Sequence, residues 1–174
     1  MDTPVNTTDE DAIQALFERH LDVGLQHGAQ LVVYDGTNRV VDLAGGVTGP
    51  DGAPTTPDTK HLIWSCTKPY AATCVHQLVE AGELEYDDPV ADHWPEFTRG
   101  DDVKADVTVR HVLSHQTGMP TSELDDDPSG WTDWEHIVDV METQELADPP
   151  GTTAAYHTVT FGWLVGELVR QVTG

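Results

Sequence analysis

Residues 64–69 read WSCTKP, and this stretch opens the apolar run that decides the fold. Pro69 is tolerated in the first turn of a helix, and Gly82 is a typical residue at a helix end. Between them the apolar residues recur at helical spacing: Tyr70, Cys74, Val75, Leu78 and Val79. We therefore predict a helix that begins at Ser65 and ends near Gly82.

The spacing of Ser65 and Lys68 predicts a nucleophile and its activating partner. Residues three apart lie on one face of a helix, so the hydroxyl and the amine can share a proton. A serine hydroxyl needs such a partner because it is a poor nucleophile until a base takes its proton. The helix N-terminus adds partial positive charge and backbone N–H groups for a developing oxyanion. The S-x-x-K pattern alone is weak, because a helix-capping serine followed by a surface lysine gives the same pattern.

The pattern predicts a helix and a hairpin before this stretch and further helices after it. The helix covers Asp9 to His27, and Gln30–Tyr34 and Arg39–Ala44 form the hairpin around an Asp-Gly turn. The loops predicted are Gly45–Thr59, rich in Gly, Pro and Thr, and the acidic segment Glu83–Asp106. Further helices are expected at Val109–His115, Trp131–Leu146 and Val159–Val172.

Four stretches then occur in an order that resembles a known family. They are WSCTKP, the Gly52–Pro57 loop, VRHVLSHQTGMP at 109–120, and Pro-Gly-Thr at 150–152 shortly before Tyr156. The chain resembles the serine β-lactamase-related hydrolases, above all class C β-lactamases and the esterases similar to them. The resemblance implies an α+β, β-lactamase/transpeptidase-like fold with helices on an antiparallel sheet. We expect residues 1–174 to be the N-terminal portion of a single such domain, truncated before its C-terminal strands.

The resemblance also implies the rest of the site. In this family a tyrosine of a Y-x-N motif works beside the lysine, and Tyr156 occupies that position in Tyr-His-Thr. His157 and Thr158 are then the expected substrate-binding residues. Thr158 stands where the family has asparagine and lacks the paired donor and acceptor of an amide, which favours an esterase over a β-lactamase. The family's third motif, K-T-G or H-x-G, does not occur after Tyr156.

The sequence thus predicts a serine hydrolase that acts on a small-molecule ester or amide through an acyl-enzyme, without cofactor or metal. The alternative is a non-catalytic remnant or interaction protein that has lost the chemistry, as the missing third motif suggests. His111 and His115 have the spacing of paired metal ligands, but without H-E-x-x-H a structural role such as hydrogen bonding at a helix end is favoured. Residues 125–136 match only half of an EF-hand, because His136 replaces the bidentate glutamate.

The composition of the chain restricts the classes of molecule that it can bind. The formal net charge is −23, from 31 acidic and 8 basic residues, and it argues against nucleic acid. Such an acidic surface is typical of proteins that work in concentrated salt, so we expect a halophilic source. Because the partner strands of the resembled fold are missing, we expect this chain alone to be poorly stable or to aggregate, and to gain compactness as salt screens its charge. No apolar run is long enough for a membrane span, and the start lacks a signal peptide, so a cytoplasmic protein is predicted. The oligomeric state stays open.

Overall fold

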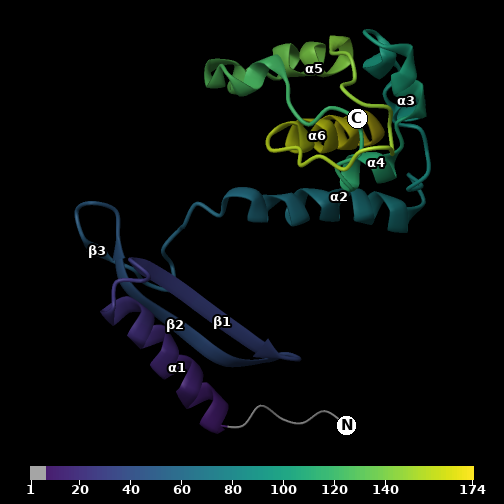
Figure 1. Cartoon of the computed structure of the whole chain (residues 1–174). Helices are drawn as coiled ribbons and strands as arrows, with labels where there is room; N and C mark the ends of the chain where they lie inside the picture. The colour runs from purple at the N-terminus through teal and green to yellow at the C-terminus, as the bar shows by residue number, and fades with distance from the viewer. Residues whose placement is uncertain (1–6) are drawn as a thin grey trace. The chain divides into compact units, whose positions relative to one another are not determined.

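The computed structural model describes residues 7–174, which form two compact units on either side of the boundary between Leu62 and Ile63. The first unit holds a helix and a small sheet, and the second is built of helices (Figure 1). Within the described residues, no helix combines the length and the apolar character that crossing a bilayer requires.

The first unit contains the predicted helix and hairpin. Its elements are α1 (Thr7–Asp22), β1 (Gly28–Asp35), β2 (Asn38–Thr48) and β3 (Ala53–Pro54), and the strands pair antiparallel in the order β1-β2-β3. The sheet therefore extends into the segment Gly45–Thr59 that we expected to be a loop. Helix α1 ends earlier than predicted, because the N–H groups of Leu25 and Gln26 both bond to the His20 carbonyl and Gly24 takes a φ of 73°.

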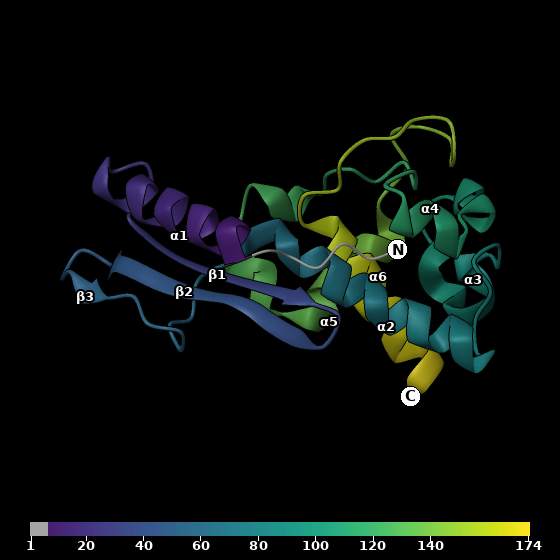
Figure 2. The same ribbon diagram turned by 90° about the horizontal axis from the view of Figure 1, so that it is seen from below.

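Helix α1 lies alongside the hairpin in both views (Figures 1 and 2). The approach is close at Gly45 of β2. A Cβ atom at this position would lie 2.7 Å from a methyl carbon of Leu21 and 3.3 Å from the ring of Phe17. The absence of a side chain at Gly45 therefore lets Leu21 and Phe17 pack closely against the strand, and a larger residue would force the Leu21 methyl group to move.

The second unit packs around α6 (Thr160–Thr173). In Figure 1 α6 lies between α2 (Lys68–Ala81) and α5 (Trp134–Thr143) and contacts both helices, with α3 (Val90–His93) and α4 (Val109–Leu113) near one end. The helix is buried on several sides, which agrees with the dense apolar pattern that predicted it. Its buried apolar residues are Phe161, Trp163, Leu164, Val165 and Leu168.

Short elements fill the segments between these helices. A 3-10 turn, Trp64–Thr67, precedes α2, and Gly82 ends that helix with a φ of 76° as predicted. The expected acidic loop Glu83–Asp106 instead contains α3 and the 3-10 turns Pro95–Thr98 and Asp102–Asp106. These turns form because Val90, Trp94 and Phe97 are buried in the core. Burial against distant residues leaves no apolar periodicity in the sequence of this segment, so the turns were not predicted.

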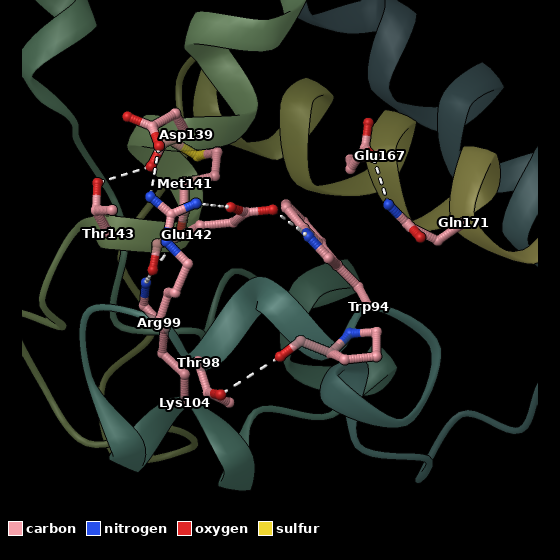
Figure 3. Close-up of polar contacts among 11 residues, drawn as sticks. Trp94, Thr98, Arg99, Lys104, Asp139, Met141, Glu142, Thr143, Glu167 and Gln171 are labelled. Atoms are coloured by element: carbon pink, nitrogen blue, oxygen red, sulfur yellow. Dashed lines mark hydrogen bonds and ion pairs between the residues drawn. The ribbon is translucent and has the colours of Figure 1, made fainter.

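A buried carboxylate connects α5 to these turns (Figure 3). Glu142 accepts a hydrogen bond from Trp94 Nε1 at 2.9 Å and one from Arg99 Nη1 at 2.6 Å. Arg99 Nη2 also donates to Asp139 at 2.6 Å. Trp94 is fully buried, so its N–H depends on Glu142 for a partner.

Lys104 is also fully buried next to this network. Its Nζ donates to the backbone carbonyls of Met141 and Glu142, each at 2.9 Å, and lies 5.2 Å from the centroid of the Phe97 ring. Burial lowers the pKa of Lys104 from 10.5 to about 8, and the nearby carboxylates of Asp101 and Glu142 oppose this shift only in part. The lysine therefore loses its proton more easily in the folded protein than in the unfolded chain.

This difference predicts a stability that rises with pH. Between pH 8 and 10.5 the unfolded chain binds a proton at Lys104 that the folded protein does not, so the free energy of unfolding increases across this window. The gain is about 3 kcal/mol at most, at about 1.4 kcal/mol for each pKa unit. Denaturant unfolding at a series of pH values measures it, and Lys104→Met is the control. A pH slope in this window that is equal in parent and variant would contradict the prediction.

Candidate active site

Ser65 lies in the 3-10 turn that leads into α2. The Ser65 carbonyl accepts the N–H of Lys68, the first residue of the helix. The preceding residue, Trp64, has a φ of 48°, in the left-handed region that a bulky side chain seldom adopts. Such strain is frequent at functional positions and requires support from the surrounding structure.

Lys68 is half-buried and reaches both Ser65 and the segment before α6. Its Nζ lies 3.1 Å from Ser65 Oγ and donates to the carbonyl oxygen of Thr158 at 2.8 Å. The same nitrogen is 4.8 Å from the centroid of the Tyr156 ring and 5.8 Å from that of Phe161. Lys68 therefore connects its own helix to a residue 90 positions later in the chain.

Tyr156 completes the predicted trio. Hydrogen bonding with the Ser65 hydroxyl, and then with the Lys68 amine, lowers the pKa of the Tyr156 phenol below its ordinary value. The side chain is 55% exposed, so the phenol is open to a bound molecule. The structure thus brings Ser65, Lys68 and Tyr156 together, and the three groups can exchange protons.

The two residues after Tyr156 take different places. Thr158 is exposed at the site, and its carbonyl holds Lys68. His157 is buried, with Nε2 at 2.6 Å from Thr117 Oγ1 and Nδ1 at 2.5 Å from the carbonyl of Ala155. The His157 ring therefore stabilises the interior of the loop. It does not reach the surface, where we expected His157 to bind substrate.

A cavity of about 300 Å³ lies beside Ser65. Its walls are mainly apolar and include Trp64, Trp131 and Phe161, with Ser65 and Lys68 at one side. Sequence reasoning missed Trp131, since nothing in its local pattern separates a tryptophan that lines a cavity from one that fills the core. Space of this kind accepts an apolar group next to the nucleophile.

The family model described as Beta-lactamase matches residues 13–174. Among curated proteins, the chain is 38% identical over 154 residues to "Esterase/beta-lactamase LipL" of Mycobacterium tuberculosis, covering 84% of this chain and 34% of that protein. It is 35% identical over 150 residues to "Penicillin-binding protein 4" of Amycolatopsis lactamdurans, covering 84% of this chain and 39% of that protein.

Two solved structures are similar over almost the whole chain. A family VIII carboxylesterase has a TM-score of 0.89 and 33% identity, and a penicillin-binding protein homologue from Caulobacter crescentus has 0.86 and 36%. Each match covers 99% of this chain and 46% of the solved chain. These likenesses confirm the predicted fold class, and the chain spans less than half the length of the proteins it resembles.

Proposed function

Because this chain belongs to the β-lactamase family, we propose that it carries the nucleophile of a serine hydrolase that acts through an acyl-enzyme on Ser65. Lys68 and Tyr156 are its proton-transfer partners. The observation that carries the proposal is the distance of 3.1 Å from Lys68 Nζ to Ser65 Oγ, with the Tyr156 phenol beside both. A hydroxyl, an amine and a phenol at such range form a complete path for one proton.

The reaction begins when Ser65 Oγ attacks the carbonyl carbon of an ester and its proton passes to the Lys68 amine. The tetrahedral intermediate then collapses, the bond to the leaving alcohol breaks, and Tyr156 gives its phenol proton to the departing oxygen while it takes a proton from Lys68. Water hydrolyses the acyl-enzyme by the reverse proton path and releases the acid. The N-terminal end of α2 places partial positive charge near the developing oxyanion.

Esters with an apolar acyl group are the proposed substrates. The cavity beside Ser65 has aromatic walls and offers few polar groups to a peptide or a carboxylated lactam. Thr158, in place of the family's asparagine, removes an amide that pairs with such polar substrates. The likeness to a family VIII carboxylesterase supports the same choice. The cytoplasmic location and the adaptation to salt, both expected from the sequence, stay predictions.

Labelling with a fluorophosphonate followed by peptide mass spectrometry tests the proposal. We expect an adduct on Ser65 in a chain extended to the full length of its relatives, and no adduct after Ser65→Ala. Ser114, an exposed serine that bonds to the Arg110 carbonyl, is the matched control, and Ser114→Ala should label like the parent. Absence of any serine adduct in the parent would reject the proposal.

Trp131 is expected to limit the size of the acyl group. The indole N–H donates to the Leu124 carbonyl at 2.7 Å and the ring meets Trp163 edge-on at 6.1 Å, so it forms a fixed wall of the cavity. Trp131→Ala should raise kcat/KM for nitrophenyl decanoate relative to nitrophenyl acetate by about 10-fold, since removing a wall admits additional methylene groups. Trp131→Phe should change the ratio less. An unchanged ratio in Trp131→Ala would show that the acyl chain lies elsewhere.

A further inference from the structure

His115 lies directly behind Tyr156 and has an unusual backbone conformation. Its φ is 61°, and apart from Trp64 it is the one non-glycine residue in the described part of the chain with a positive φ. The helix α4 has already ended at Leu113, so His115 is not needed to continue it. A conformation this rare is retained where the surrounding contacts require it.

Those contacts hold the residues on both sides of Tyr156. The His115 carbonyl accepts the N–H of Ala155 at 3.0 Å, and His115 Nδ1 accepts the N–H of His157 at 3.1 Å. One residue therefore binds the backbone immediately before and immediately after the tyrosine. These two hydrogen bonds leave the Tyr156 backbone little freedom to move relative to His115.

The His115 ring also supports the side chain of Tyr156. Its centroid is 4.8 Å from that of Tyr156 and 5.0 Å from that of Phe161. Lys68 Nζ lies near the same two aromatic rings. The phenol is thus held on one side by the imidazole, close to the amine with which it exchanges a proton.

The hydrogen bonds determine the tautomer of this ring. A nitrogen that accepts an N–H carries no proton, so His115 is neutral with its hydrogen on Nε2. Burial lowers the pKa of His115, and the charge of Lys68 lowers it further, which keeps Nδ1 free to accept. His157, whose backbone N–H is the donor, is braced in turn by Thr117 and is itself buried.

We propose that His115 is a positioning residue that holds Tyr156 beside Ser65 and Lys68, through two hydrogen bonds to the neighbouring backbone and the tilted packing of its ring against the phenol ring. Its part in the reaction rests on the proposed function, whereas the placement of the phenol does not. The role uses both the side-chain nitrogen and the left-handed backbone. Asparagine is therefore the conservative replacement, because it tolerates positive φ and carries an acceptor oxygen close to the place of Nδ1.

The test compares His115→Ala, His115→Asn and a control in a chain extended to the full length of its relatives. The control is His111→Ala, whose ring accepts the Thr108 N–H in the cap of α4 and so affects stability alone. Two quantities are measured: the rate of Ser65 phosphonylation for each folded molecule, and the pKa of Tyr156. The second uses the fluorine resonance of incorporated 3-fluorotyrosine, assigned with Tyr156→Phe.

His115→Ala should slow phosphonylation by about 10- to 100-fold, the range expected for a displaced catalytic group. The pKa of Tyr156 should rise toward its ordinary value as the phenol leaves Ser65 and Lys68. His115→Asn should recover most of the rate and most of the lowering of the Tyr156 pKa. His111→Ala should lower the melting temperature but leave the rate within about 2-fold of the parent and the Tyr156 pKa unchanged. His115→Ala with an unchanged rate and an unchanged Tyr156 pKa would overturn the proposal. If the parent takes no label at Ser65 while the Tyr156 pKa still depends on His115, the positioning stands and the proposed function fails.

Discussion

Replacement of Lys68 by methionine is expected to slow acylation of Ser65 by about 100-fold or more, the usual contribution of a positioned proton acceptor. Methionine keeps much of the length of the side chain and removes the amine. The Ser65 hydroxyl then loses the nitrogen at 3.1 Å, and the exposed phenol of Tyr156 must act without the neighbouring amine. Stability should change little by comparison, because Lys68 is only half-buried.

Pre-steady-state release of nitrophenol from an activated ester measures this step directly. The matched control is Lys60→Met, a change at an exposed lysine eight positions earlier, which should leave the burst rate as in the parent. Thermal unfolding of both variants separates loss of chemistry from loss of fold. A burst rate in Lys68→Met within about 3-fold of the parent would show that another group accepts the serine proton, since a general base is worth far more.

Replacement of Glu142 by alanine is expected to lower the free energy of unfolding by about 4 kcal/mol, the range found when one partner of a buried polar network is removed. The main loss is at Trp94, which is fully buried and whose indole N–H has Glu142 as its one acceptor among residues 7–174. Truncation also leaves space beneath α5. Arg99 contributes less, because its side chain is 50% exposed and water can replace the carboxylate.

Two milder changes separate these contributions, and denaturant unfolding measures all three. Glu142→Gln keeps an acceptor oxygen for Trp94 and loses only the charge toward Arg99, so its cost should be about half that of alanine. Asp139→Asn affects the exposed partner of Arg99 and should cost no more than about 1 kcal/mol. Equal costs for Glu142→Ala and Asp139→Asn would contradict the central role given to the buried N–H of Trp94.

The local elements with strong periodicity were predictable from the sequence. The hairpin around the Asp-Gly turn and the apolar α6 appear where the pattern places them. Helix α2 ends at Gly82 as predicted but begins at Lys68, because Ser65 lies in the 3-10 turn before it. The spacing of Ser65 and Lys68 likewise requires only local geometry, since three residues at the start of a helix return to the same face. These features depend on contacts between residues close in the chain, and the local sequence pattern predicts such contacts.

The turns within Glu83–Asp106 and the position of the His157 ring were not predictable in this way. Trp94 meets Glu142 from 48 positions away, and His157 meets Thr117 from 40 positions away, so no window of sequence contains both partners. Short elements of this kind are stabilised by burial against distant residues and not by their own propensity.

The local geometry of Ser65 and Lys68 follows from their spacing, and the order of the motifs predicts that Tyr156 joins them. The contacts that hold the tyrosine come from distant segments of the chain and carry no local signal. His115 binds the backbone on both sides of Tyr156 from about 40 positions earlier, and Trp131 and Phe161 enclose the cavity from separate segments. The physical reason is that hydrogen bonds and packing act over a few ångströms of space, whatever the separation of the residues in the chain.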